Sequence, residues 1–579
     1  MAIALAAPAL VAQQTCPAVQ PGATMPLKYH GSSTVAAITP CDLMTRLYIY
    51  ADDSLHGREA GTPDAMRATA YIERQVRQLG LRPAGDHGTY FQYLPVTAHS
   101  VTPTSTITAG GHTFHADRDF VLSAPPADRK VAAPVIFGGT LGDTAHELTA
   151  DQAKGKTVVV MAPAGGGFFR RPRGAVNPLA DAAAIVTVAP TLPRPRFQPT
   201  LNDTVQREGQ AAYAASHPGE GNARGRGFGG AGLNVTVTPQ VASALLGKSA
   251  TSAALGDAAP SATIDIHVRT INAPTRNVVA ILPGTDPKLS KEYVVIGAHA
   301  DHIGISGVRP IAEHDSLKAY NEVARVEGAD TRSAPEPTAE QWARINAIKD
   351  SLRRIYPPRL DSISNGADDD GSGSVSILEI AQAFAQGPVK PKRSLIFIWQ
   401  MGEEKGLWGS EWFTNHPTVP RDSIVADLNL DMVGRGAATD ITGKNKAGEE
   451  LKGANNYLQL VGSRRLSTEL GDIAGSVDST EAVPFTFDYS MDANGHPQNI
   501  YCRSDHANYA RYGIPVIFFT TGGHADYHQV TDEPQYIQYE HMARVDKLVF
   551  DIATRVADLD HRVVVDRTKP DSPFARCQQ

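Results

Sequence analysis

Apolar strand patterns alternate with helical patterns over the C-terminal half of the chain. Strands are expected within 276–284, 292–304, 393–400, 424–434 and 514–522, and amphipathic helices within 373–387, 406–416 and 540–559. Strands that are apolar over nearly their whole length are typical of a mainly parallel sheet covered on both faces. The sequence therefore predicts an α/β fold, with a mixed, mainly parallel sheet sandwiched by helices.

The chain is too long for a single hydrophobic core. Its 579 residues favour two domains, or one domain with a large insertion. Residues 66–81 have the apolar spacing of a helix that stops at a glycine, whereas short β-type runs separated by Gly and Pro begin near residue 100. A Gly-, Arg- and Pro-rich stretch at 164–232 predicts a long exposed loop, with an anion-binding segment as the alternative.

Composition argues against two classes of partner. The formal net charge is −7, which gives no basic footprint for nucleic acid. No run approaches the roughly 20 apolar residues that a membrane-spanning helix needs, so no integral membrane segment is expected.

The first residues and the cysteines predict an exported protein, periplasmic or extracellular. Residues 1–12 resemble the apolar region and cleavage end of a secretory signal, although they lack the Lys or Arg expected ahead of the apolar region. An ordinary disordered terminus is the alternative. The four cysteines, Cys16, Cys41, Cys502 and Cys577, lack CxxC spacing, which argues against a structural zinc site. In an exported chain they favour disulfides, with Cys16 to Cys41 closing the shortest loop among the possible pairings.

Carboxylates and imidazoles follow several of the expected strands. Ligands of such sheets bind beyond the carboxyl ends of the strands, and the residues found there are His299, Asp301, His302, Glu403, Glu404, Asp431, Tyr527 and His528. Three aspartates, in "NGADDDGSGS" at 365–374, precede another helix. Adjacent carboxylates at the mouth of a core are costly unless a cation offsets them. Imidazole and carboxylate without thiolate is a ligand set that suits hydrolytic zinc.

The order of these motifs resembles that of a known family. "HAD", "ADDDGSG", "GEEKGLWGS", "LDMVG" and "YHQVTDEP" are similar in type and order to the co-catalytic dizinc exopeptidases, which include secreted bacterial aminopeptidases and glutamate carboxypeptidases. The resemblance covers about residues 270–560. It implies a dizinc peptidase domain at 13–100 and 270–579, after a signal remnant at 1–12. The β-rich stretch at 101–269 looks like the protease-associated domain inserted in such enzymes.

The resemblance also implies a ligand set for two zinc ions. Asp369 would bridge them, with His299 and Asp431 completing one site and Glu404 and His528 the other. It further implies a cis peptide between Asp369 and Asp370.

The remaining roles also come from the resemblance. Glu403 would be the general base for a hydroxide held between the metals, and Tyr527 would stabilise the oxyanion. Asp301 would fix the tautomer of His299. Arg503 would hold a substrate carbonyl or carboxylate, or form a structural salt bridge. Supporting roles are expected for His302, Asp368, Asp370, Asp505 and His506.

These assignments predict an exported, zinc-dependent exopeptidase that removes N-terminal residues from peptide substrates. A dizinc carboxypeptidase or another small-amide hydrolase is the alternative within the same chemistry, and it needs a cationic pocket for a free carboxylate. A non-catalytic binding protein on this fold is the alternative from another class. The segment at 305–365, about sixty residues with a helical pattern, is longer than the corresponding segment expected in a compact member of the family that the motifs resemble. This insertion either borders the active site and restricts substrate length or has no role.

Overall fold

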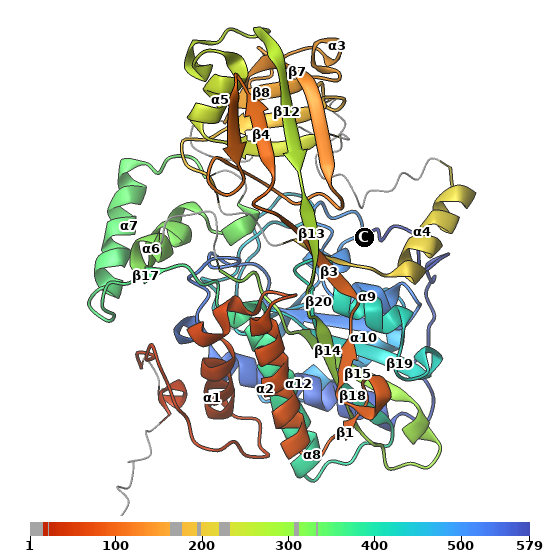
Figure 1. Cartoon of the computed structure of the whole chain (residues 1–579). Helices are drawn as coiled ribbons and strands as arrows, with labels where there is room; N and C mark the ends of the chain where they lie inside the picture. The colour runs from red at the N-terminus through yellow and green to blue at the C-terminus, as the bar shows by residue number, and fades with distance from the viewer. Residues whose placement is uncertain are drawn as a thin grey trace, which may run out of the picture. The chain divides into compact units, whose positions relative to one another are not determined.

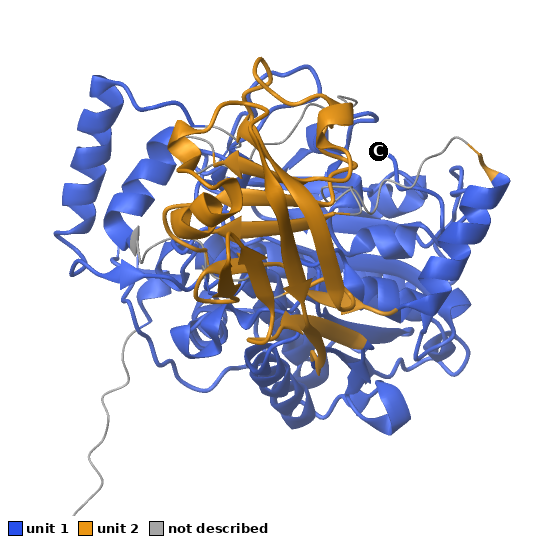
Figure 2. Ribbon diagram, turned by 45° about the horizontal axis from the view of Figure 1, so that its top comes forward, with its two compact units in different colours: residues 1–95, 203–216, 274–579 blue, residues 96–202, 217–273 orange. Residues whose placement is uncertain are grey.

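The computed structural model describes residues 16–20, 23–162, 177–193, 198–218, 232–305, 312–331, 334–454 and 456–579. The chain forms two compact units, coloured separately in Figure 2. The first unit comprises residues 1–95, 203–216 and 274–579, and the second comprises 96–202 and 217–273. The expected signal remnant at 1–12 lies outside the described residues.

A mixed sheet forms the centre of the first unit. Its strand order is β1-β14-β18-β15-β19-β22-β20-β21, with β2 also paired to β14. The strands are β1 (Arg82–Pro83), β2 (Phe91–Tyr93), β14 (Arg276–Leu282), β15 (Tyr293–His299), β18 (Ser394–Gln400), β19 (Ile424–Leu430), β20 (Tyr457–Val461), β21 (Thr486–Asp488) and β22 (Val516–Thr520). The central strands β18, β15, β19 and β22 are parallel, whereas β14 and β20 join them antiparallel. The predicted α/β class and mixed sheet are therefore confirmed.

Helices cover both faces of this sheet (Figure 1). The helices α1 (Pro40–Tyr50), α8 (Gly373–Gln386) and α12 (Tyr539–Asp558) pack together, and α8 and α12 contact β15 and β19. The short helices α9 (Trp408–Asn415) and α11 (His506–Ala510) pack together against β18, β19 and β22. This cover explains why all seven residues of β18 are buried. Two further helices, α2 (Pro63–Gln78) and α10 (Thr468–Asp478), pack on β14 and α12, respectively.

Local signals fix the ends of the expected helix in 66–81. The helix α2 begins at Pro63, whose fixed φ suits a first helical position, and the Thr62 side chain accepts a hydrogen bond from the Ala65 N–H. Gly80 follows the helix with φ +74°, a conformation that favours glycine.

The insertion at 305–365 forms a small helical layer. The strands β16 (Ala312–Glu313) and β17 (Leu360–Asp361) pair antiparallel at its base, and α6 (His314–Ala324) packs against α7 (Ala339–Leu352). The helical pattern noted in the sequence is thus confirmed as α7. A short 3₁₀ turn, Gly328–Asp330, follows α6.

The second unit is β-rich. An eight-stranded sheet has the order β5-β4-β12-β7-β8-β9-β11-β6, and a three-stranded sheet has the order β10-β3-β13. The elements are β3 (Val96–Val101), β4 (Thr106–Ala109), β5 (His112–His115), β6 (Phe120–Leu122), β7 (Arg129–Thr140), α3 (Ala150–Ala153), β8 (Thr157–Met161), β9 (Ala184–Val188), β10 (Pro199–Leu201), β11 (Leu233–Val237), α5 (Pro239–Leu246), β12 (Ala258–Ile266) and β13 (Val268–Asn272). Its identity as a protease-associated domain stays a prediction.

Two features of 164–232 differ from the predicted continuous loop. Its described residues include β9, β10 and the helix α4 (Thr204–Ser216), and α4 belongs to the first unit although it lies inside the predicted insert. The alanines of α4 favour a helix, and this local signal outweighs the Gly- and Arg-rich composition around it. The Gly- and Arg-rich segments at 163–176 and 219–231 lie outside the described residues.

All four cysteines are paired. Cys16 bonds to Cys41, the pairing that closes the shortest loop, and Cys502 bonds to Cys577, so the expected disulfides are present. No helix within the described ranges is both long and apolar enough to cross a membrane.

Candidate metal centre

The predicted ligands meet at the carboxyl edge of the central parallel strands. His299 is the last residue of β15, Asp431 follows β19 directly, and Glu403 and Glu404 follow β18 by three and four residues. His528 lies in the loop after β22. Parallel strands end at the same edge, so residues far apart in the sequence become neighbours there.

His299, Asp369 and Asp431 form the first of two groups that share Asp369. The Nε2 atom of His299 lies 3.1 Å from Asp369 Oδ1 and 3.6 Å from Asp431 Oδ1. One donor atom from each of these buried residues lies within 4.8 Å of the others, a spacing suited to one metal ion. The group matches one predicted zinc site.

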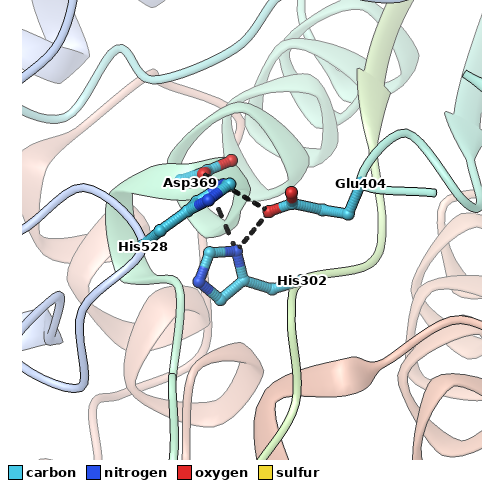
Figure 3. Close-up of side chains that lie close together, drawn as sticks. All are labelled: His302, Asp369, Glu404 and His528. Carbon is cyan, nitrogen blue, oxygen red and sulfur yellow. Dashed lines mark ion pairs between the residues drawn. The ribbon is translucent and has the colours of Figure 1, made fainter. Parts of the chain in front are cut away.

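His302, Asp369, Glu404 and His528 form the second group, drawn in Figure 3. The Nε2 atom of His528 lies 3.0 Å from both Asp369 Oδ2 and Glu404 Oε1. The Nδ1 atom of His302 lies 2.9 Å from the same Glu404 oxygen. Because Asp369 presents one oxygen to each group, it stands where a bridging carboxylate would. His302 lies among the donors of this group, a position not expected from the sequence.

Several buried donor atoms of these groups have no hydrogen-bond partner within the described part of the chain. They are His299 Nε2, both ring nitrogens of His302, Asp369 Oδ2 and Glu404 Oε1. Unpaired polar atoms in a buried site are costly, and each of these residues offers one such atom to a donor group. Nitrogen and carboxylate oxygen are donors that zinc accepts. The donor set therefore fits two zinc ions.

Asp369 is oriented by its two neighbouring aspartates. Asp370 accepts hydrogen bonds from the backbone N–H groups of His299 (3.0 Å) and Gly373 (2.8 Å), while Asp368 accepts one from Gly434 N–H (2.7 Å). The peptide between Asp369 and Asp370 is cis, as the resemblance implied. The flanking carboxylates thus satisfy backbone donors, and the middle one is left for the metals.

Asp301 acts on the site differently from the prediction. The Nδ1 atom of His299 lies 3.1 Å from the backbone carbonyl oxygen of Asp301, whereas its carboxylate is 3.7 Å away. That carboxylate instead accepts hydrogen bonds from the N–H groups of Gly402 (2.7 Å) and Glu403 (3.2 Å). The carbonyl therefore orients the imidazole, and the carboxylate positions the turn that carries Glu403 and Glu404.

Asp431 is held by a polar chain. The hydroxyl of Ser504 donates to Asp431 Oδ2 (2.7 Å), and the side-chain amide of Asn429 donates to that hydroxyl oxygen (3.0 Å). All three residues are buried, so the carboxylate has little freedom to turn away from the first group.

Electrostatics keep the donor carboxylates ionised. Burial opposes ionisation of Asp369, but contacts with His299 and His528 hold its pKa well below its ordinary value. Burial likewise opposes ionisation of Glu404, whose pKa is nevertheless lowered to about 2 by His528 and His302. Burial opposes a charge on His299, but nearby carboxylates, Asp431 first, raise its pKa well above the ordinary value. Without metal, the ionised carboxylates are therefore balanced by protonated imidazoles, whose protons a bound cation would replace.

Glu403 belongs to neither donor group and lines the adjoining pocket with Asp369 and Asp431. Burial raises the pKa of Glu403 well above its ordinary value; the charge of His299 opposes this effect, and Glu404 reinforces it. A carboxylate that takes up protons readily beside a metal centre has the properties of a general base. The geometry is consistent with that predicted role.

Tyr527 and Arg503 also line this pocket. The Tyr527 ring stacks on His528, with ring centroids 4.0 Å apart, and Arg503 Nη2 donates to the Tyr527 hydroxyl at 3.2 Å. Burial raises the pKa of Tyr527 well above its ordinary value, so the hydroxyl keeps its proton. Arg503 Nη1 also forms an ion pair with Asp330 at 3.0 Å, which is the salt-bridge alternative from the sequence.

The structure gives His302 a more direct place than the supporting role expected from the sequence, and it adds one group that the sequence analysis did not expect. His302 follows His299 by three residues, and that spacing was the only sequence signal for its place in the second group. A third buried group, His314, Asp361 and Glu533, also has the spacing of metal ligands. Arg359 forms ion pairs with both carboxylates of this third group, so a protein cation already neutralises them.

The chain matches one protein-family model, described as Peptidase family M28, over residues 277–553. The chain is therefore similar to peptidase family M28 over just under half of its length. All the donors described above lie inside the matched range, as does the insertion. This similarity agrees with the resemblance seen in the motifs.

Curated relatives match over a limited part of their length. Leucine aminopeptidase 1 of Uncinocarpus reesii is 28% identical over 232 residues, which cover 37% of this chain and 51% of that protein. Leupeptin-inactivating enzyme 1 of Streptomyces exfoliatus is 41% identical over 78 residues, which cover 13% of this chain and 18% of that protein. The chain thus spans about half, or less, of the length of these relatives.

Two solved structures align with most of the chain. An aminopeptidase from Aneurinibacillus sp. strain AM-1 has 17% identity and a TM-score of 0.46, covering 92% of this chain and 97% of its own. BSAP, a zinc aminopeptidase from Bacillus subtilis, has 16% identity and a TM-score of 0.47. The alignment covers 91% of this chain and 97% of the BSAP chain.

Proposed function

We propose that the chain is an M28 peptidase, and specifically a two-zinc exopeptidase that removes N-terminal residues from peptides. The observation that carries the proposal is the pair of donor groups that share Asp369 beside the free carboxylate of Glu403. The names of the relatives, which include leucine aminopeptidases, agree with it.

His299, Asp369 and Asp431 would hold one zinc ion, and Asp369, His302, Glu404 and His528 the other. When bound, the two ions would supply Lewis acidity that polarises the scissile carbonyl and makes a water molecule more acidic. Asp369 and Glu404 are ionised before metal arrives, because neighbouring imidazoles lower their pKa values. These two carboxylates therefore need no deprotonation at neutral pH, whereas His299 and His528, whose pKa values are raised by nearby carboxylates, would release a proton when metal binds.

Glu403 would accept a proton from the attacking water and pass it to the leaving amine. Its backbone is held by Asp301, whose carboxylate accepts the Glu403 N–H. The Tyr527 hydroxyl would donate a hydrogen bond to the carbonyl oxygen as negative charge develops there. Arg503 donates to the oxygen of that hydroxyl, so the hydroxyl proton remains free to point toward substrate.

The pocket favours removal of N-terminal rather than C-terminal residues. Arg503 is the one cationic residue among the described residues that line it, and Asp330 already neutralises its charge. A carboxypeptidase needs a free cation for the substrate carboxylate, and the described lining offers none. Anionic groups dominate this lining instead, which suits a positively charged substrate terminus.

Kinetics on two substrate sets test the proposal. Aminoacyl p-nitroanilides and N-blocked dipeptides with free carboxyl ends are compared at equal concentrations, with zinc quantified in the same preparation. We expect hydrolysis of the p-nitroanilides only, close to two zinc ions per chain, loss of activity with chelator, and recovery with zinc. Hydrolysis of the blocked dipeptides alone would support the carboxypeptidase alternative. Full zinc occupancy without any hydrolysis would support a binding protein.

We further propose that the chain is exported to an oxidising compartment. Both disulfides fit that environment, since cytosolic thiols are kept reduced, and residues 1–12 have the character of a signal remnant. Fractionation of the source cells would place the protein outside the cytosol if this is right. The second unit is proposed as a protease-associated domain on its β-rich pattern alone.

A further inference from the structure

The insertion contributes two acidic side chains to the candidate substrate pocket. Glu327 and Asp330, just beyond α6, line the pocket together with Glu403, Asp369 and Asp431. The insertion is therefore part of the pocket wall. The question is what an added pair of carboxylates does there.

The segment that carries these residues is fixed against the loop of the metal centre. The N–H of Ala329 donates to the backbone carbonyl oxygen of Tyr527 at 3.0 Å. Gly328 has φ +52°, and a Cβ at this position would lie 2.4 Å from the same Tyr527 oxygen, so only glycine permits the contact. Asp330 adds an ion pair to Arg503. Glu327 is thus held at a set place beside the site.

Apart from Glu403, the proposed base, Glu327 is the one acid of this pocket whose charge has no partner among the described residues. Asp330 pairs with Arg503, while Asp369 and Asp431 belong to the donor groups for metal. Among the described residues, no Lys, Arg or His lies within ion-pair distance of the Glu327 carboxylate, which is partly exposed at the pocket wall. A carboxylate held in place without a cation is ready to receive one from a ligand.

The other residues that line the pocket indicate the chemical character of that ligand. Met432, Met491, Ile500 and Phe518 give the pocket an apolar wall, and the described lining residues offer only one cation, Arg503, which is already paired. A ligand with an aliphatic portion and a positive charge fits both features. Residues at a peptide N-terminus are of this kind: they carry an α-ammonium group, and Lys and Arg add a cation on an aliphatic stem.

We infer that Glu327 is a specificity-determining residue that receives a substrate cation, either the α-ammonium group or a basic side chain at the N-terminal position. This inference rests on the proposed function, because it concerns the substrate of the same site. Glu327 binds substrate and takes no part in proton transfer. A charge-assisted hydrogen bond of this kind contributes roughly 10- to 100-fold to binding.

Kinetics of Glu327→Gln on a matched pair of substrates test the inference. Norleucine and lysine p-nitroanilides have similar aliphatic side chains, but only the lysine side chain carries an ammonium group. A rise in KM for both, with kcat nearly unchanged, would assign the α-ammonium group to Glu327. A rise for lysine alone would assign the side chain. Unchanged KM for both would overturn the inference.

Two further variants separate binding from structural damage. Glu327→Asp keeps the charge and should recover part of the lost affinity, whereas a purely structural effect would not follow charge. Glu340→Gln removes an exposed carboxylate of α7 in the same insertion and should change neither KM. A wild-type chain that hydrolyses neither substrate would contradict the proposed function itself, an outcome distinct from an unaffected Glu327→Gln variant.

Binding without turnover gives a second readout. Calorimetry in the Glu403→Gln background compares norleucinamide, lysinamide and N-acetylnorleucinamide, with and without Glu327→Gln. If Glu327 receives the α-ammonium group, its substitution should weaken binding of both free amines about 10-fold or more and leave the acetylated ligand unchanged. If it receives the side chain, only lysinamide should be affected. Equal affinities in both backgrounds would overturn the inference.

Discussion

Glu403 and Glu404 are adjacent in the sequence but face different surroundings. Glu404 lies within 3.0 Å of the ring nitrogens of His302 and His528, whereas Glu403 lines the pocket. The hydrogen bonds from Gly402 and Glu403 to Asp301 fix the turn between strand and helix, which separates the two side chains. One pair of residues can thereby serve both metal binding and proton transfer.

Glu403→Gln separates these two roles. We expect zinc content to stay near the wild-type value, because Glu403 belongs to neither donor group, and kcat to fall by about 10²- to 10⁴-fold, the usual contribution of a general base. Initial rates and metal analysis on the same preparation measure both. As a contrast, Glu404→Gln should lose zinc as well. If Glu403→Gln kept more than about a tenth of wild-type kcat, another group would be the base.

His302→Gln tests a donor to which the sequence analysis gave only a supporting role. Because a His302 nitrogen approaches Glu404 at 2.9 Å with no hydrogen bond to satisfy it, we expect it to bind metal. Zinc affinity of one site should fall about 10-fold or more, in the range seen when residues around a metal are removed. Chelator competition measures the affinity, and His112→Gln, an exposed change in the second unit, is the control. Unchanged affinity at both sites would show that His302 is not a ligand.

The sequence revealed most of the site but not all of its residues. His299, Asp431 and the two glutamates follow strands directly, so the topology of a parallel sheet is enough to bring them together. Glu327 has no such signal, because its place in the pocket depends on how the insertion packs against the Tyr527 loop. Arg503 had two possible roles in the sequence analysis, and the Asp330 carboxylate that pairs with it also comes from the insertion.

At the scale of elements, α1 and α8 are joined by a buried ion pair. Arg46 Nε lies 3.0 Å from Glu379 Oε2, and both side chains are about 2% exposed or less. Glu379 also accepts a hydrogen bond from the Thr39 N–H at 3.1 Å, just before α1 begins. Because α8 follows Asp369 in the chain, this pair also ties the helix next to the metal centre to the N-terminal segment.

Glu379→Ala should strongly destabilise the first unit. The substitution leaves the Arg46 guanidinium buried without its carboxylate, which typically lowers the free energy of unfolding by about 3–5 kcal/mol. Urea unfolding followed by circular dichroism measures this loss. The double variant Arg46→Met with Glu379→Leu should recover much of it, because no charge remains buried. A loss below about 1 kcal/mol in the single variant would mean that Arg46 finds water or another partner.

Elements with strong periodicity or continuous apolar runs were predicted, and others were not. The helices α2, α8 and α12 combine apolar faces with clear ends, and β18 is apolar throughout. The antiparallel edge strands β1 and β2 are two and three residues long, too short for a pattern to emerge. The helix α4 was missed because its neighbours are rich in glycine and arginine.

At the scale of the whole molecule, α4 shows why domain boundaries were predicted only approximately. Asp203 accepts a hydrogen bond from the Asn415 side chain at 2.6 Å, and Gln206 accepts one from Arg511 at 2.8 Å. These contacts place α4 in the first unit, although sequence on either side of it belongs to the second. A boundary read from composition does not detect a chain that leaves one unit and returns to it.

The two disulfides lie in the first unit and close loops of different length. Cys502–Cys577 spans 75 residues, and Cys16–Cys41 spans 25. The chain-entropy model assigns about 4.5 kcal/mol to the longer loop and about 3.5 kcal/mol to the shorter one. Just outside the longer loop, Gln579 donates from its N–H to Asn499 Oδ1 at 3.0 Å and its carbonyl oxygen accepts from the Gly495 N–H at 2.7 Å.

Replacing each cysteine pair by serine tests whether this difference governs stability. We expect Cys502→Ser with Cys577→Ser to lower the free energy of unfolding by about 1 kcal/mol more than Cys16→Ser with Cys41→Ser, because the longer loop constrains the unfolded chain more. Denaturant unfolding without reductant measures both, and wild-type protein with reductant should approach the variant that lacks all four cysteines. In the variant that lacks Cys502 and Cys577, limited proteolysis should cut the chain near residue 577 first. Equal losses, or a larger loss for the shorter loop, would mean that native contacts around the disulfides outweigh loop entropy.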